Sequence, residues 1–379
     1  MTARVENAPW LVSDELHGVS SFLRLSNSMS ASPEDSPLRQ SQKEMWEAAP
    51  LVTRSANGLL RRSFMQKSNL LIGVDGPIAA YKTTLLTTLE QVGGPAIRSY
   101  VEPASRGNEM LALFYSDPVR FAEPMQFNAL RIRFGIMIDV FVEMQKLHKE
   151  GRAALFAVER MWPWDWAFKR ANEMLGRFSE EASAEYESLM NDAWDVLFVP
   201  NMFYFIRVDP AASHERIKLR GRGCEVKQRV QCFMCSGQKD PALSADDPGV
   251  VSEICDYCGN RFLCEDGPVP LSYLKILEQA QAELAKIVVD RGYMMSSVDG
   301  RSDLTENDFL NTVDKFADDR EVEDYDTQIA HLKKFERRAT GLYINSLRRI
   351  GMTRDEVLEQ HRAYLADEDA KAPPAVADT

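Results

Sequence analysis

Short apolar runs alternate with longer amphipathic stretches between residues 69 and 300. The apolar runs are bounded by Gly or polar residues, which is typical of buried strands. The strands predicted in this way are 69–75, 97–102, 154–159, 202–208 and 293–298. The stretches between them predict helices at 108–115, 118–149, 163–176, 179–194, 211–221 and 271–290. This alternation indicates an α/β fold with a parallel five-stranded sheet and helices on both faces.

The two ends of the chain have a different character. Residues 1–66 include a segment rich in Ser and Pro, 26–42, and are predicted to form a mostly disordered arm. Residues 301–379 are predicted to form a helical extension with an acidic tail. Ligands of a parallel sheet bind at the carboxyl ends of its strands, so the residues just after each predicted strand are the candidates for a site.

Charge and hydropathy exclude some classes of function. The net charge of −12 argues against a chain built to coat nucleic acid or an acidic membrane. No run of about 18 apolar residues is present, so no membrane-spanning helix is expected. The first 20 residues include Glu6, Asp14 and Glu15 and lack a long apolar core, which argues against a secretory or mitochondrial leader. The expected location is the cytoplasm.

A phosphate-loop motif follows the first predicted strand. Gly76-Pro-Ile-Ala-Ala-Tyr81-Lys82-Thr83 nearly fits G-x-x-x-x-G-K-[ST] and opens a predicted helix. Backbone N–H groups at such a helix start cradle phosphates, the lysine reaches the β and γ oxygens, and the threonine hydroxyl holds Mg²⁺. Gly76, Lys82, Thr83 and Thr84 are therefore predicted to bind ATP.

Tyr81 departs from this motif, which has glycine before the lysine. Glycine permits a backbone conformation that a side chain resists. One interpretation is a tolerated substitution in a slightly opened loop, and the other is a loop that no longer binds ATP well. In either case, restoring glycine is expected to tighten ATP binding.

Paired cysteines interrupt the α/β pattern within residues 226–268. Cys232-x2-Cys235 is followed after nineteen residues by Cys255-x2-Cys258, which is the spacing of a structural zinc site. These four cysteines predict an inserted zinc module, and reduced free thiols are the alternative. Cys224 and Cys264 are further candidate ligands.

Five sequence blocks occur in an order that resembles the deoxynucleoside kinases, cellular and viral, especially their deoxycytidine/deoxyguanosine branch. The blocks are GPIAAYKTT (76–84), EPASR (102–106), LALFYSDPVRFAEPMQFNALRIRF (111–134), ERM (159–161) and RIKLRGRGCE (216–225). The resemblance implies a P-loop kinase domain over 67–225 and 269–300. The zinc module 226–268 would then interrupt the lid that closes over the nucleotide.

The resemblance implies a catalytic set at the strand ends. Glu102 would be the general base for the sugar 5′-hydroxyl, as a carboxylate at a strand end can be. Arg160 would clamp the phosphate or the 5′-oxygen, and Lys82 would contact the phosphates. Glu159 and Thr83 would hold Mg²⁺. Met161 stands where the family has serine.

The resemblance also implies a substrate set. Tyr115 and Glu225 would bind the sugar 3′-hydroxyl, and Gln126 would read the base edge through its amide. Arg133 lies two helical turns after Gln126, and it would pair with Asp165 to favour deoxycytidine or a purine deoxynucleoside. The lid arginines, which would neutralise the transferring phosphate, are Arg216, Arg220 and Arg222.

The resulting hypothesis is an enzyme of nucleotide salvage that phosphorylates the 5′-hydroxyl of a deoxynucleoside with ATP. The alternative is a catalytically silent protein that keeps the kinase fold for a scaffolding role, because Tyr81 replaces the loop glycine. A nucleoside monophosphate kinase is less favoured, since it would carry a DR-type motif at Glu159-Arg160. No membrane or nucleic-acid partner is expected, and a homodimer is left open. Divergent motifs favour a viral relative, which would place the protein in a host cytoplasm.

Overall fold

The structure is a computed structural model that describes residues 68–102, 108–220, 250–254, 261–265, 269–300 and 304–371. The predicted arm 1–66 lies outside the described residues. Most of the predicted α/β segment lies within them. The remaining gaps contain several predicted site residues, namely Arg222, Glu225, Cys232, Cys235, Cys255 and Cys258.

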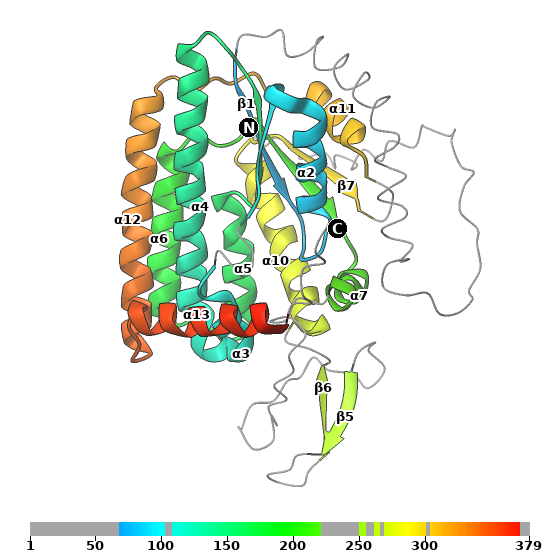
Figure 1. The fold of residues 1–379 in the computed structure, drawn as a ribbon, viewed down its shortest axis with the longest axis vertical. Coiled ribbons are helices and arrows are strands. Elements are labelled where there is room, and N and C mark those ends of the chain that lie inside the picture. The colour runs from blue at the N-terminus through cyan, green and yellow to red at the C-terminus, as the bar shows by residue number, and fades with distance from the viewer. Residues whose placement is uncertain are drawn as a thin grey trace, which may run out of the picture. The chain divides into compact units, whose positions relative to one another are not determined.

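A five-stranded parallel sheet forms the centre of the described part of the chain (Figure 1). Its strand order is β2-β3-β1-β4-β7. The strands are β1 (Leu70–Asp75), β2 (Ile97–Tyr100), β3 (Leu155–Glu159), β4 (Met202–Arg207) and β7 (Met295–Asp299). All four pairings between neighbours are parallel. The sheet confirms the predicted α/β class, and each strand lies within about two residues of its predicted range.

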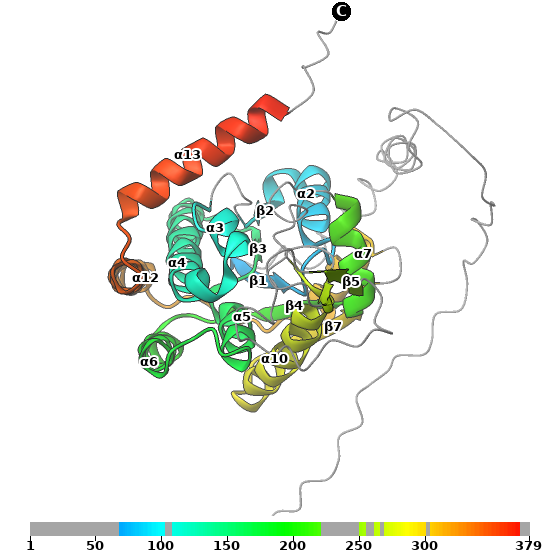
Figure 2. The same ribbon diagram turned by 90° about the horizontal axis from the view of Figure 1, so that it is seen from below.

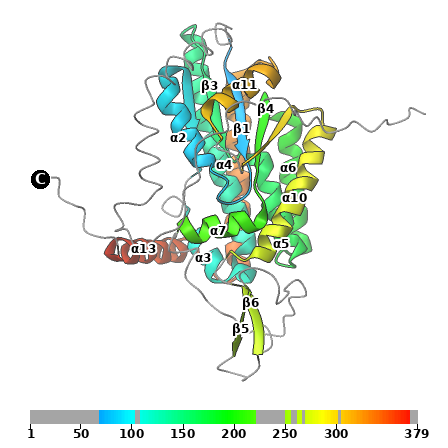
Figure 3. The ribbon, with the colours of Figure 1, turned by 90° about the vertical axis from the view of Figure 1, so that its right-hand side faces the viewer.

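Helices cover both faces of this sheet. They are α2 (Lys82–Gly93), α3 (Leu111–Ser116), α4 (Pro118–Lys149), α5 (Trp162–Met174), α6 (Glu180–Val196), α7 (Pro210–Arg220), α10 (Leu271–Asp290), α11 (Glu306–Phe316), α12 (Tyr325–Arg349) and α13 (Arg354–Lys371), with a short 3-10 turn η1 (Gly94–Ala96) after α2. Helices α2 and α11 lie on one side, while α4, α5 and α10 lie on the other (Figures 2 and 3).

Alternating strand residues divide the core into two layers. Leu71, Phe156 and Phe203 face α4 and α5, whereas their neighbours Ile72 and Leu155 face α2 and α11. Each of these side chains is fully buried. Successive side chains of a strand point to opposite faces, so strands that are apolar throughout require helices on both sides.

Local signals fix where the long helices begin. Asp117 accepts a hydrogen bond from the backbone N–H of Arg120, and Pro118 occupies the first turn of α4. Asp324 likewise accepts from the N–H of Thr327 at the start of α12. Side chains of this kind satisfy N–H groups that have no partner within the helix.

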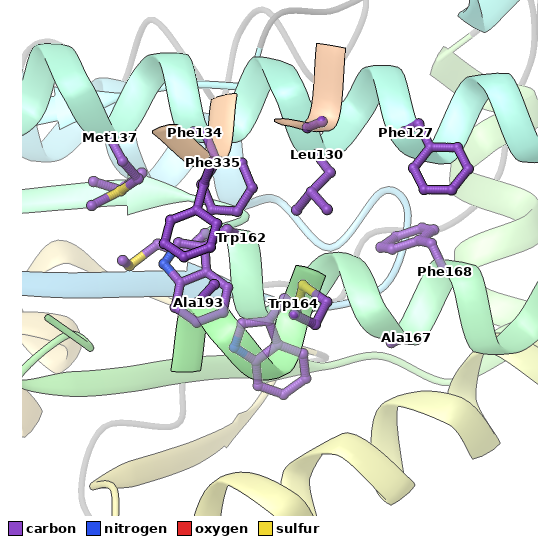
Figure 4. Packing of buried hydrophobic residues seen from close by; sticks show 14 of the residues in the cluster. Phe127, Leu130, Phe134, Met137, Trp162, Trp164, Ala167, Phe168, Ala193 and Phe335 are labelled. Carbon is purple, nitrogen blue, oxygen red and sulfur yellow. The ribbon is translucent and has the colours of Figure 1, made fainter. Parts of the chain in front are cut away.

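The C-terminal helix α12 is part of the same core. It packs along α4 and also contacts α6 (Figure 1). The ring of Phe335 lies 5.7 Å from that of Phe134, which in turn lies 6.1 Å from that of Trp162 (Figure 4). Buried rings of this size contribute about 3–5 kcal/mol each when compared with alanine. The predicted C-terminal extension thus covers helix α4.

The described part of the predicted insert is a two-stranded antiparallel hairpin, β5 (Val250–Ile254) and β6 (Arg261–Glu265). The four predicted zinc ligands lie outside the described residues, and the residues that are described contain no cluster of metal-binding side chains. The zinc site therefore stays a prediction. Among the described helices, none combines the length and apolar character that a membrane crossing needs.

Candidate active site

Three carboxylates lie at one edge of the sheet. Asp75 ends β1, Glu159 ends β3, and Glu102 follows β2 by two residues. Since these strands are neighbours and parallel, their carboxyl ends meet. The loop after β1 leads to α2 on one face, and the loop after β3 leads to α5 on the other. Loops that diverge in this way open a crevice, which is where α/β sheets bind ligands.

The phosphate loop closes tightly at Gly76. Its φ of 152° lies outside the range that side chains favour, and a Cβ there would lie 2.4 Å from the carbonyl oxygen of Ile206. Only glycine fits. The Nζ atom of Lys82 donates to the carbonyl oxygens of Gly76 at 3.1 Å and Pro77 at 2.7 Å. The lysine predicted to contact phosphates therefore points into the loop that would hold them.

Burial shifts the pKa values of two groups at this loop. The side chain of Lys82 is 4% exposed, and burial lowers its pKa to about 8, with the nearby charge of Arg160 acting in the same direction. Burial also raises the pKa of Asp75 to about 6, against the opposing effects of Lys82 and Arg160. Lys82 thus remains cationic at neutral pH but lies close to the point at which it loses its proton.

Tyr81 adopts the left-handed conformation that the motif normally assigns to glycine. Its φ and ψ are 59° and 15°, and it directly precedes the first residue of α2. For a residue with a side chain, this conformation costs roughly 1–2 kcal/mol. The loop therefore carries the strain that the motif predicts for a residue with a side chain, and the expected tightening of ATP binding by glycine stays a prediction. How tightly the loop binds ATP stays a prediction.

A hydroxyl and a carboxylate meet where Mg²⁺ was predicted. Oγ1 of Thr83 donates to Oε2 of Glu159 at 3.0 Å, and the backbone N–H of Glu102 donates to the same oxygen at 3.3 Å. Hydroxyl and carboxylate oxygens are ligands that Mg²⁺ prefers, usually with several waters. These two side chains fit the predicted ion.

Glu102 is held by two arginines. Its Oε1 lies 2.7 Å from Nη2 of Arg133, and its Oε2 lies 3.1 Å from Nη1 of Arg160. Burial alone would raise the pKa of Glu102, but Arg160, Arg133 and Lys82 outweigh it and keep that pKa below its usual value. Glu102 is therefore an anion in the ligand-free protein. Arg160 itself has a φ of 52°, and backbone strain of this kind is often found at functional sites.

Arg133 also pairs with Asp165, as the sequence predicted. Asp165 is fully buried and accepts a hydrogen bond from the Tyr186 hydroxyl at 2.7 Å. Gln126 lies two turns earlier on α4, and its Oε1 is buried with no hydrogen-bond partner among the described residues. An unpaired buried amide oxygen is costly unless a ligand satisfies it.

Fewer contacts locate the other predicted site residues. Burial lowers the pKa of Arg160, but nearby acidic groups outweigh it and raise that pKa. Tyr115, on α3, is one of these groups, with a smaller effect than the three carboxylates of the site. Arg216 lies over the ring of Tyr81. Thr84 and Arg220 are exposed on α2 and at the end of α7, respectively.

Two residues of this region belong to no motif in the sequence. Asp75 is only the end of a predicted strand, although it lies directly before Gly76 and is surrounded by cations. Tyr186 belongs to α6, far along the chain from Asp165, and no local pattern marks it. Its position becomes evident only when α5 and α6 pack together.

Comparison with known proteins identifies the segment that carries this site. Residues 72–231 match the sequence model of the family described as Deoxynucleoside kinase. This segment is therefore similar to the deoxynucleoside kinases. The deoxyguanosine kinase of Dictyostelium discoideum is 30% identical over 155 residues, which are 41% of this chain and 52% of that protein. The deoxyadenosine kinase of the same organism is 26% identical over 176 residues, which are 46% of this chain and 66% of that protein. The chain thus spans only about half to two thirds of these two kinases.

Solved structures of a deoxynucleoside kinase resemble the chain more distantly. Deoxyadenosine kinase from M. mycoides with bound dATP gives a TM-score of 0.44 at 17% identity, covering 64% of this chain and 98% of that one. The same enzyme with bound dCTP gives a TM-score of 0.43 at 14% identity, covering 65% of this chain and all of that one.

Proposed function

We propose that this protein transfers the γ-phosphate of ATP to the 5′-hydroxyl of a deoxynucleoside. One observation carries the proposal: Glu102, held by Arg133 and Arg160, lies at the same sheet edge as the phosphate loop with Lys82 and Thr83. Such an edge combines groups for phosphate, metal ion and hydroxyl. The match of residues 72–231 to the sequence model of the deoxynucleoside kinases supports the same reaction.

In the proposed reaction the 5′-oxygen attacks the γ-phosphorus, the bond to the β,γ-bridging oxygen breaks, and ADP leaves. The hydroxyl proton passes to Glu102. Lys82 and Arg160 supply positive charge for the phosphate oxygens. Mg²⁺, which Thr83 and Glu159 would hold, supplies further neutralisation of the phosphates when bound.

The low pKa of Glu102 limits how it acts. A carboxylate between two arginines is a weak base, so most of its contribution would come from orienting the hydroxyl and accepting the proton late in the transfer. Phosphoryl transfer has a loose transition state in which positioning and electrostatics dominate. A weakly basic but well-placed carboxylate is compatible with that chemistry.

Deoxycytidine or a purine deoxynucleoside is the proposed substrate. The Arg133–Asp165 pair is buried, and charge-assisted pairs of this kind are rigid. Together with the unpaired Oε1 of Gln126 it presents donors and acceptors to a base edge. Nucleotide salvage, a structural zinc ion on the four cysteines and a cytoplasmic location belong to the same proposal and rest on the sequence, and a homodimer stays open.

A phosphorylation screen tests the function. Purified protein, γ-labelled ATP and Mg²⁺ are incubated with each of the four deoxynucleosides, and the labelled monophosphates are separated. A Lys82→Met variant and a 5′-deoxy analogue of the best substrate serve as controls. Labelled product from the wild type alone, and only with the 5′-hydroxyl present, is the expected result.

The competing function is a silent protein that keeps the kinase fold, because Tyr81 and Met161 both depart from the family motifs. It predicts no product with any of the four deoxynucleosides. A melting temperature that does not respond to ATP and Mg²⁺ would support it, whereas an active kinase is stabilised by its ligand.

A further inference from the structure

The aromatic ring of Tyr81 lies against a cation from another element. Cζ of Arg216 is 4.4 Å from the centre of the ring. Tyr81 belongs to the phosphate loop, while Arg216 is in α7, which lies beside the start of α2 (Figure 3). An arginine over an aromatic face within about 6 Å is a cation–π contact. The residue that breaks the loop motif therefore joins the loop to α7.

Arg216 has a second contact, and one of its donor groups has no partner among the described residues. Its Nη2 donates to the carbonyl oxygen of Gly300 at 3.0 Å. Its Nη1 is buried and has no hydrogen-bond partner among the described residues. A buried charged donor that lacks a partner is unfavourable, and an anion is the ligand that relieves it. Within the described part of the chain, Nη1 of a guanidinium that contacts the phosphate loop thus has no partner.

The backbone of Tyr81 makes this contact informative. The side chain occupies the left-handed region at φ 59°, where glycine would be unstrained. Strained residues persist where the surroundings hold them, and they gather at functional sites. Tyr81 is about half exposed, at 52%, so burial of apolar area does not account for its strained conformation. The contact with Arg216 is the interaction that a glycine could not make.

We propose that Tyr81 is a positioning residue that holds Arg216 beside the phosphate loop, with Nη1 directed to a phosphate oxygen of a nucleoside triphosphate. This inference rests on the proposed function only for the identity of the anion. It assigns a role to the tyrosine that the loop motif would treat as a defect. It also reverses the expectation for Tyr81→Gly, because glycine removes the ring that holds the cation.

The test compares four proteins by calorimetric titration of ATP at saturating Mg²⁺. Tyr81→Phe keeps the ring face and should bind ATP within about twofold of wild type. Tyr81→Leu keeps the backbone strain and apolar bulk without the ring face, and Tyr81→Gly removes both. Each should bind about two- to fivefold more weakly, as expected for an exposed cation–π contact. If the phenylalanine and leucine variants bind equally, the ring does not position Arg216.

A double-mutant cycle separates positioning from a general effect on the loop. In an Arg216→Met background, Tyr81→Leu should cause no further loss of ATP affinity, because the cation is gone. An unchanged loss in that background would overturn the inference. Melting temperatures of all variants are recorded, and Arg291→Met serves as a control, because it removes an arginine that lies over another ring, that of Trp194.

Titration with Mg²⁺–tripolyphosphate distinguishes this inference from the proposed function, since it needs no nucleoside. Coupling between Tyr81 and Arg216 in tripolyphosphate binding, without phosphorylation of any deoxynucleoside, would support the inference and reject the kinase activity. Phosphorylation of a deoxynucleoside without coupling between Tyr81 and Arg216 would support the kinase activity and reject the inference. A wild type that binds neither ATP nor tripolyphosphate would overturn the inference, because Arg216 would then have no phosphate to meet.

Discussion

Nη2 of Arg133 lies 2.7 Å from Oε1 of Glu102, and the same guanidinium pairs with Asp165. The arginine predicted to read the base is thus bonded directly to the carboxylate predicted to receive the proton. Arg133 is 4% exposed, so both contacts are shielded from water and electrostatically strong. A substitution or ligand that changes the ion pairs of Arg133 should therefore alter both base recognition and the charge around Glu102.

Glu102→Gln should lower kcat by about 100-fold or more, because the amide keeps the shape of the side chain but cannot accept the proton. Binding of the deoxynucleoside should change little. The measurement combines steady-state phosphorylation at saturating substrates with calorimetric titration of the nucleoside.

Glu143→Gln is the matched control for that variant. Glu143 also pairs with an arginine, Arg98, and accepts from the Tyr100 hydroxyl, but it lies away from the phosphate loop. It should leave kcat nearly unchanged. If Glu102→Gln retains more than about a tenth of the wild-type kcat, Glu102 is not the general base.

Arg133→Met combined with Asp165→Ala should shift substrate preference toward thymidine. The pair would fill space that the methyl group of thymine needs, and its removal would free that space. The expected change in relative kcat/KM is at least about tenfold, which is typical of altering one specific contact in a binding pocket. Overall kcat should also fall, because Glu102 loses one of its two arginines. An unchanged ranking of the four deoxynucleosides would reject the assignment.

Tyr186→Phe gives a finer version of the same experiment. It removes only the hydroxyl that donates to Asp165 and keeps the ring in the core. A small loss of base discrimination, with kcat retained, is expected if Asp165 acts by holding Arg133.

The elements of the fold were predictable because each has its own local signal. The range 118–149 predicted for one helix is the extent of α4, since Asp117 and Pro118 mark its start. The pairing of Arg133 with Asp165 was implied by family resemblance, and the structure brings the two together. The contact between Tyr186 and Asp165 depends on the packing of α6 against α5, and the contact between Tyr81 and Arg216 depends on where α7 lies. Neither follows from residue spacing.

The conformation of Tyr81 shows the limit of motif reasoning. The motif says which residue is easiest to place at that point, but not what the surroundings can support. Asp75 shows the same limit. A carboxylate at the end of a predicted strand is expected to be exposed to solvent, but Asp75 is only 1% exposed in the structure. Burial arises from how elements pack, and one chain segment does not encode it alone.

Thr83→Val should raise the Mg²⁺ concentration needed for half-maximal ATP turnover, because it removes the hydroxyl that would bind the ion. Thr83→Ser keeps the hydroxyl and should behave like wild type. Titration of Mg²⁺ at fixed ATP measures the effect. Identical Mg²⁺ requirements in the valine and serine variants would show that Thr83 does not bind the metal ion.

The zinc prediction is tested by metal analysis of the purified chain. About one zinc per chain is expected, and it should be lost from a Cys232→Ser, Cys255→Ser variant because a structural site needs all four ligands. A Cys224→Ser, Cys264→Ser variant should keep the ion. Zinc-free wild-type protein, or equal zinc in both variants, would reject the predicted ligand set.

Binding of ATP should weaken as pH rises from 7 to 9. Burial lowers the pKa of Lys82 to about 8, helped by Arg160 and opposed by Glu159, Asp75 and Glu102. Over this interval the cationic fraction of such a lysine falls about tenfold, and the affinity for the phosphates should fall with it. Asp75, with a pKa of about 6, stays ionised throughout and adds no step of its own.

The stability of the free protein should respond to Lys82 in the opposite direction. The unfolded chain holds the lysine proton up to its ordinary pKa of 10.5, whereas the folded chain releases it near 8. Between these values the unfolded state binds more protons, so the contribution of this group to stability rises with pH. Lys82→Arg, whose guanidinium stays charged, should remove both pH effects. Calorimetric ATP titrations at pH 7, 8 and 9 and melting curves from pH 8 to 10 provide the two measurements, and a pH dependence shared by wild type and Lys82→Arg would assign the titration to another group.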